Sequence, residues 1–291
     1  MSATLNATFE PVVGRYLRMK LQGRSHRIYV EEAGQGIPLL CLHTAGADTR
    51  QYRALLNDAR ILQHFRVVAF DLPWHGKSSP PEGWQDRDYA LTSRAYLDTI
   101  LAVADALALE KPVAMGCSIG GRIALHLALH HAERFRAIIG LEAGAHVDPY
   151  YDLGWLHRPD VHGGEVCAGV VSGLIAPGSP DADRWETLWH YMQGGPGVFK
   201  GDLHFYTADG DMRGQLGAID TRKCPLYLLT GEFDYSCTPE DTLEVARRIP
   251  GAEAIIMKDI GHFPMSEHPQ RFLDYLRPVL EKIRLEKIRG A

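Results

Sequence analysis

The stretch of sequence that decides the fold is Gly116-Cys117-Ser118-Ile119-Gly120-Gly121. The apolar run before it, residues 112–115, is typical of a short buried strand, and its proline stands at the first position, where a strand tolerates one. Residues 122–129 after it have helical spacing and helix-forming composition. Glycines on both sides of a serine at such a junction permit a tight turn that exposes the hydroxyl. The stretch therefore predicts a nucleophile elbow with Ser118 at its tip.

Chance is the competing explanation for this motif. A chain with 29 glycines can contain Gly-x-Ser-x-Gly in an ordinary loop. The strand before the motif, the helix after it, and a further glycine at Gly121, where helix and strand must pack closely, favour the elbow.

Composition narrows the class of protein. The 291 residues carry a formal charge of -5 without basic blocks, which argues against nucleic acid or an anionic membrane as a partner. Residues 1–13 lack the pattern of a signal peptide, and no apolar run approaches the roughly 20 residues that cross a bilayer. The five scattered cysteines fit reduced thiols in a cytoplasmic protein. Nothing in the composition indicates the oligomeric state.

Strand-like runs alternate with helical patterns along the chain. Several of the runs are continuously apolar, as strands covered on both faces must be. The alternation predicts an α/β fold with a doubly wound, mostly parallel sheet. The further expected strands are 27–32, 38–42, 66–70, 137–141, 225–229 and 254–257, and the further expected helices lie near 51–62, 93–109, 242–248 and 269–283.

The strand pattern stops between Ala145 and Asp220, where glycine, proline and aromatic residues accumulate. We interpret residues 147–219 as a lid inserted between two strands of a core formed by 1–146 and 220–291. Most of its aromatic side chains can form a small core of the insertion itself. A few are expected to face a pocket, because a lid needs an apolar underside to exclude water. Trp155 and Trp189 are the candidates.

A serine hydroxyl needs a base to take its proton, and the base needs an acid that fixes its tautomer. Asp234 follows the predicted strand 225–229, and His262 follows the strand 254–257, so the chain order is Ser, Asp, His. Both residues should lie at the carboxyl edge of the sheet, where open α/β folds hold their sites. Glu232 and Glu142 are rival candidates for the acid, and Asp234 is favoured because it lies on the loop just before the strand of His262.

Attack on a carbonyl produces an oxyanion, which requires preorganised hydrogen-bond donors. One expected donor is the backbone N–H of Ile119, the residue after the nucleophile. The other is expected from the loop after Leu42, most simply the N–H of Ala45.

These residues resemble the α/β-hydrolase superfamily over nearly the whole chain, from about Tyr16 to Ile283. The resemblance rests on the elbow, the His43 loop, residues 71–78 (DLPWHGKS), Asp234 with the following Pro239, and Gly261-His262. It implies a Ser118-His262-Asp234 triad.

Two positions depart from many relatives, which have His-Gly in place of His43-Thr44 and glycine in place of Trp74. His43, Thr44 and Trp74 are further candidates for the substrate pocket, which the tryptophan would narrow. His75 could also line it, although its turn setting suits a structural role. A serine at position 118 argues against the epoxide hydrolase and haloalkane dehalogenase branches, which attack through a carboxylate.

The sequence therefore predicts a serine hydrolase without cofactor or metal that cleaves a small-molecule carboxylic ester or thioester. No P-loop, dinucleotide fingerprint or metal-spaced cluster is present. One alternative is hydrolysis of a carbon–carbon bond in a dienoic or β-diketone acid, for which Arg122, Arg158 and Arg184 are candidate cations. The other is a ligand receptor on the same fold with slow turnover.

Overall fold

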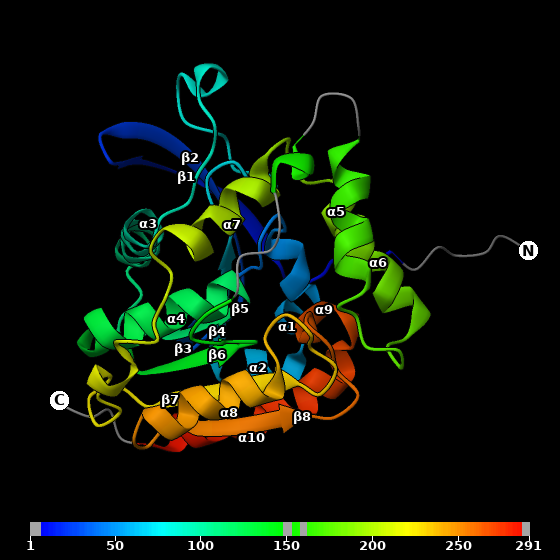
Figure 1. Ribbon diagram of the computed structural model, residues 1–291. Helices are drawn as coiled ribbons and strands as arrows, with labels where there is room; N and C mark the ends of the chain where they lie inside the picture. The colour runs from blue at the N-terminus through cyan, green and yellow to red at the C-terminus, as the bar shows by residue number, and fades with distance from the viewer. Residues whose placement is uncertain (1–6, 148–152, 158–161, 287–291) are drawn as a thin grey trace, which may run out of the picture.

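The computed structural model describes residues 7–147, 153–157 and 162–286, and its centre is an eight-stranded sheet (Figure 1). The strands lie in the order β1-β2-β4-β3-β5-β6-β7-β8. β1 and β2 pair antiparallel with each other, and β2 pairs antiparallel with β4, while all remaining pairs are parallel. The bounds are β1 Val13–Leu21, β2 Arg24–Gly34, β3 Ile37–Leu42, β4 Phe65–Phe70, β5 Val113–Cys117, β6 Ala137–Leu141, β7 Leu226–Gly231 and β8 Glu253–Met257.

The order of the strands creates a topological switch point at β3. The chain passes from β3 to β4 on one side, and then returns to pair β5 with the other side of β3. Open α/β sheets bind ligands outside the carboxyl ends of the strands at such a point. The segments that follow β3 and β5, which contain Ala45 and Ser118, therefore meet at one crevice.

Two helical layers cover the sheet. One face packs on α3 (Ser93–Ala106), α4 (Ile119–His130) and α8 (Pro239–Arg248). The opposite face packs on the second layer. Its helices are α1 (Arg53–Leu56), α2 (Ala59–Leu62), α9 (Pro264–Glu267) and α10 (Pro269–Leu285). Continuously buried strands such as β5 and β6 result from this double cover.

The predicted fold class is confirmed, with local differences. The expected strands match β2 to β8 closely, but β1 was not expected. Its residues are mostly exposed, so it lacks the apolar run of a central strand. The helix expected near 51–62 is divided into a 3₁₀ turn, Thr49–Tyr52, and the short helices α1 and α2, because Asp58 caps a new helix there by accepting the N–H of Ile61.

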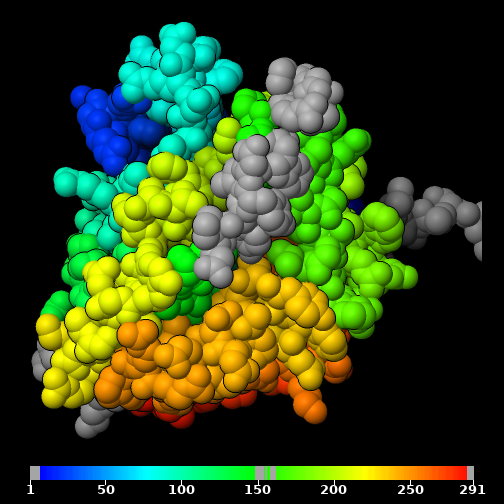
Figure 2. Space-filling view, in the orientation of Figure 1, coloured from blue at the N-terminus to red at the C-terminus, as the bar shows by residue number. Residues whose placement is uncertain are grey.

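The chain between β6 and β7 contains three longer helices, α5 (Gly163–Ser172), α6 (Asp181–Met192) and α7 (Val198–Ala208), and the 3₁₀ turn η4 (Leu153–Leu156). Figure 1 shows α7 above the ends of β5 and β6, with α5 and α6 to its right, and Figure 2 shows the three helices in green to yellow-green above the orange surface of the C-terminal part. Val171, Leu188 and Tyr191 form a small apolar cluster with Ala47 and Phe263 from the core. The function of this segment as a lid stays a prediction.

Within the described ranges, no helix combines the length and the apolar character needed to cross a membrane.

Candidate active site

Ser118 lies at the tip of a sharp turn between β5 and α4, with φ of 61° and ψ of -113°. This backbone conformation is unfavourable for a residue with a side chain. The neighbouring glycines make the turn possible by close approach: a Cβ on Gly116 would lie 2.3 Å from the carbonyl oxygen of Gly120, and one on Gly120 would lie 2.7 Å from that of Leu42. The hydroxyl of Ser118 therefore projects beyond the end of the sheet.

The structure brings Ser118, His262 and Asp234 into one hydrogen-bonded line, although they lie far apart in the sequence. The distance from His262 Nε2 to Ser118 Oγ is 2.9 Å, and that from His262 Nδ1 to Asp234 Oδ2 is 2.7 Å. Since Nδ1–H donates to the carboxylate, Nε2 is free to accept the serine proton. All three residues are buried. This arrangement suits a nucleophile, a base and an orienting acid.

Asp234 is held as a carboxylate by its surroundings. Burial opposes its charge, but the contact with His262 outweighs it and the pKa of Asp234 is lowered. Its second oxygen accepts the backbone N–H groups of Ser236 at 2.7 Å and Cys237 at 3.1 Å. These bonds fix the plane of the carboxylate that faces the imidazole.

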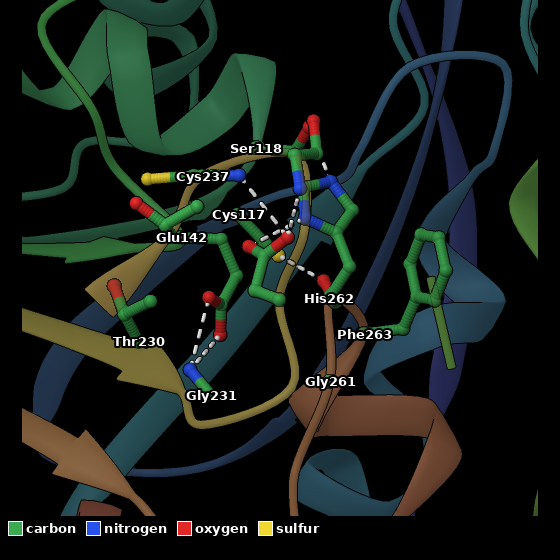
Figure 3. A network of polar contacts seen from close by, with 12 residues as sticks. Cys117, Ser118, Glu142, Thr230, Gly231, Cys237, Gly261, His262 and Phe263 are labelled. Atoms are coloured by element: carbon green, nitrogen blue, oxygen red, sulfur yellow. Dashed lines mark hydrogen bonds and ion pairs between the residues drawn. The ribbon is translucent and has the colours of Figure 1, made fainter. Parts of the chain in front are cut away.

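Glu142 lies directly after β6 and contacts Asp234 instead of His262. Its carboxyl group accepts the N–H of Gly231 at 3.0 and 3.1 Å, as Figure 3 shows, and is hydrogen-bonded to the side chain of Asp234. Burial and the charge of Asp234 raise the pKa of Glu142 well above its ordinary value, which favours its protonated form. The other rival, Glu232, lies apart from the triad, where its carboxylate accepts the N–H of Asp259 at 3.2 Å.

The two expected oxyanion donors lie beside Ser118. Ala45 lines the same cavity as Ser118, and Ile119 begins helix α4, where the first N–H groups have no partner within the helix. The N–H groups on either side of Ala45 are engaged, because Thr44 donates to Gln51 and Gly46 donates to Asp202.

A cavity of about 120 Å³ opens at Ser118 and His262. Its walls are apolar apart from a few hydroxyl groups, and none of the described residues that line it is Arg or Lys. Tyr206 reaches into it from α7, with its hydroxyl 3.3 Å from Ser118 Oγ. The other wall residues are Ala45, Leu156, Val170, Val171, Leu174, Tyr191, Phe199, Leu203, Ser236 and Phe263.

His43 and Thr44 were expected to line the pocket, and the structure corrects this prediction. His43 accepts the N–H of Leu72 at Nε2 and donates from Nδ1 to the carbonyl of Thr44. Burial lowers the pKa of His43 to about 4, which keeps it neutral for these bonds. The Thr44 hydroxyl donates to Gln51 and accepts the hydroxyl of Tyr191. Both residues support the cavity wall from behind.

Two of the predicted tryptophans, Trp74 and Trp189, also lie elsewhere. Trp189 is 58% exposed on α6, and Trp74 packs against Tyr89 and Trp84 beside a different cavity. Trp155 belongs to η4, but its side chain lies outside the described residues. The aromatic residues that do line the cavity are Tyr191, Phe199, Tyr206 and Phe263.

Of the candidate cations, Arg122 is buried behind Tyr206. Its guanidinium lies 5.1 Å from the Tyr206 ring centroid and donates to the carbonyls of Gly144 and Gly210. Arg184 bonds to the carbonyl of Pro177 near the surface. Arg158 lies outside the described residues. Among those residues, no group of three His, Cys, Asp or Glu side chains forms a metal site.

Sequence reasoning missed Asp202, a completely buried residue of α7. Its carboxylate accepts His75 Nε2–H and Gly46 N–H, each at 2.7 Å, and the hydroxyl of Tyr89 at 2.8 Å. His75 thus has the structural role. Asp202 joins α7 to the loop that contains Ala45, and one acidic residue on a helix gave no signal of this contact.

Comparisons with known proteins agree with this fold. The family model described as alpha/beta hydrolase fold matches residues 37–160. The chain is 27% identical to a pimeloyl-[acyl-carrier protein] methyl ester esterase of Aeromonas salmonicida, covering 86% of this chain and 98% of that one. It is 28% identical to a 2-hydroxymuconate semialdehyde hydrolase of Pseudomonas putida, covering 90% and 92%.

Among solved structures, a thermophilic esterase from Thermogutta terrifontis superposes with a TM-score of 0.81 at 22% identity, covering 93% of this chain and 99% of that one. This similarity concerns the fold. The family model assigns residues 37–160 to the alpha/beta hydrolase fold, and the relatives and the solved structure extend the similarity over most of the chain. The relatives named here include hydrolytic enzymes that act on esters.

Proposed function

We propose that the protein is a serine hydrolase that cleaves a carboxylic ester or thioester of small to medium size through an acyl-enzyme. The observation that carries this proposal is the line from Asp234 through His262 to Ser118, with contacts of 2.7 and 2.9 Å, at the wall of an apolar cavity. Such a line is the arrangement that activates a serine hydroxyl.

The reaction proceeds in two halves. His262 Nε2 takes the proton of Ser118 as Oγ bonds to the acyl carbon, and the N–H groups of Ala45 and Ile119 stabilise the oxyanion. His262 then gives the proton to the leaving oxygen or sulfur, whose bond to the acyl carbon breaks. In the second half a water gives its proton to His262 and attacks the acyl carbon. The proton then returns to Ser118 Oγ as the ester bond to the enzyme breaks.

The cavity walls favour a neutral substrate. The described wall residues provide apolar surface and hydroxyl groups, but no cation to bind a carboxylate. A dienoic acid, the substrate class of the alternative carbon–carbon hydrolysis, would bring a carboxylate into this cavity. An uncharged ester or thioester avoids burying that charge.

A fluorophosphonate probe tests this chemistry, because it reacts with an activated serine. We expect it to label Ser118, and we expect Ser118→Ala to remain folded while losing labelling and about 10⁴-fold or more in turnover of p-nitrophenyl esters. An unlabelled Ser118 or a fully active Ser118→Ala variant contradicts the proposal. Labelling with only a single turnover supports the receptor alternative instead.

A further inference from the structure

A second cavity of about 390 Å³ adjoins the cavity at Ser118. It lies between the beginning of α5, the end of α6 and the loop of residues 193–197. Three residues line both cavities: Leu156, Tyr191 and Phe199. These three side chains therefore form the partition between the two spaces.

Two of the three partition residues are fixed by their contacts. The Tyr191 hydroxyl is bonded to Thr44, and the Tyr191 ring packs edge-on against Phe263 at 5.4 Å. Leu156 is 4% exposed. A side chain held by a hydrogen bond or by close packing on most sides cannot move aside readily.

Phe199 differs from its neighbours in the partition. It is only half-buried and lies in the first turn of α7. Its ring covers Gly46, since a Cβ at Gly46 would lie 2.9 Å from Phe199 Cδ2. Gly46 follows Ala45, the proposed oxyanion donor. Phe199 therefore closes the cavity at the side of the oxyanion loop.

The proposed reaction determines which part of the substrate meets Phe199. The leaving group must stay within reach of His262 Nε2, on the side that His262 and Ser236 line. The carbonyl oxygen points to the N–H groups of Ala45 and Ile119. The acyl chain is then directed to the remaining side, where α7 meets the oxyanion loop.

On the basis of the proposed function, we infer that Phe199 is a specificity-determining residue that limits the protein to short acyl groups, and that the second cavity, whose lining is mainly apolar, is an extension which Phe199 keeps separate. The space at Ser118, about 120 Å³, is smaller than the second cavity, about 390 Å³. This volume suits a short acyl chain.

Acyl-chain preference tests this inference. For the wild-type protein we expect kcat/KM on p-nitrophenyl esters to be highest for short acyl groups and to decrease toward octanoate. Phe199→Ala should raise the octanoate-to-acetate ratio of kcat/KM at least about tenfold, because each methylene placed against an apolar wall contributes roughly fourfold. Phe199→Leu should give an intermediate ratio, and it provides a milder variant if the alanine protein is unstable.

Two controls test whether Phe199→Ala acts by opening the second cavity or only by enlarging the cavity at Ser118. Leu203→Ala removes bulk from the same face of α7, but Leu203 lines only the cavity at Ser118. It enlarges that cavity without opening the second one, so it should raise the octanoate-to-acetate ratio much less than Phe199→Ala does. Gly163 lines only the second cavity, and a Cβ there would lie 4.0 Å from its nearest neighbour, the carbonyl of Leu156. Gly163→Leu should therefore fill the extension and abolish the gain of Phe199→Ala in the double variant.

The outcomes of this experiment separate the inference from the proposed function. Hydrolysis of short esters by the wild type, together with an unchanged chain-length profile in both Phe199 variants, overturns the inference and leaves the hydrolase proposal standing. The inference is also overturned if Leu203→Ala raises the octanoate-to-acetate ratio as much as Phe199→Ala does. The same holds if the Phe199 variants gain activity only on acetate esters of long-chain alcohols, since the long chain is then the leaving group. If the wild type cleaves no ester or thioester, the proposed function itself fails.

Discussion

Glu142 and Asp234 form a pair of contacting carboxyl groups at the site, and their environments shift their pKa values in opposite directions. Asp234 accepts two backbone N–H groups and faces His262, which lowers its pKa. Burial and the charge of Asp234 raise the pKa of Glu142. A protonated Glu142 can donate to Asp234 and so hold it toward His262, without acting as the acid of the triad.

This difference predicts unequal effects of two matched substitutions. Asp234→Asn should lower turnover on the order of 10⁴-fold, because an amide no longer holds the imidazole in the correct tautomer. Glu142→Gln should cost less than about tenfold, since an amide can still donate to Asp234 and accept the N–H of Gly231. Steady-state kcat on one p-nitrophenyl ester measures both. The reverse order of effects would make Glu142 the acid.

Helix α7 connects the cavity to the core of the molecule. Phe199, Leu203 and Tyr206 have the spacing of one helix face and line the cavity, while Asp202 points to the core. The pair of Asp202 and His75 is completely buried. Burial alone would lower the pKa of His75, but the Asp202 carboxylate outweighs this and raises it. Helix α7, which shapes the cavity, is thus attached to the core through the pair of Asp202 and His75.

Removal of this charge should release the attachment of α7. Without Asp202, burial lowers the pKa of His75 and the imidazole becomes neutral. Asp202→Asn should therefore lower the free energy of unfolding by about 1.5–3 kcal/mol, the usual contribution of a hydrogen bond to a charged group. The raised pKa of His75 means that the pair stabilises the fold below pH 6.5 and that this contribution is lost as the pH rises through the folded-state value. Urea unfolding at pH 6 is therefore the suitable measurement.

The control for Asp202→Asn is Asp98→Asn, the same change in an exposed pair. Asp98 lies 3.7 Å from Arg94 on α3, and both side chains are largely exposed. Such pairs contribute about 1 kcal/mol at most. Similar losses of stability in the two variants would show that the buried pair does not hold α7.

At the scale of the whole molecule, the central strands and the place of Ser118 could be predicted from the sequence. Which side chains of the inserted helices face the cavity could not. β5 and β6 are continuously apolar because helices cover both faces, so they could be recognised, and Ser118 follows the first of them directly. The exposed strand β1 carries no such signal. Trp189 and Tyr191 are two residues apart on α6, yet one is exposed and the other buried. The tertiary packing of α6 determines which of these two side chains is buried.

The stability of the whole molecule should depend on the neutral form of buried His126. This residue of α4 packs against Phe205 of α7, with ring centroids 5.8 Å apart. Burial lowers the pKa of His126 to about 4 from 6.5. Between these values the unfolded chain binds a proton that the folded protein excludes. His126 therefore destabilises the fold progressively as the pH falls from about 6.5 to 4.

We therefore expect the stability of the His126→Leu variant, relative to that of the wild type, to increase as the pH falls. The difference in unfolding free energy between variant and wild type should move by about 2.5 kcal/mol in favour of the variant from pH 7.5 to 4.5. This comparison cancels the titration of other buried groups, such as Asp71, whose pKa burial raises to about 6 and which acts with the opposite sign. Urea denaturation of both proteins measures it. A difference independent of pH would mean that His126 has the same pKa in the folded and the unfolded protein.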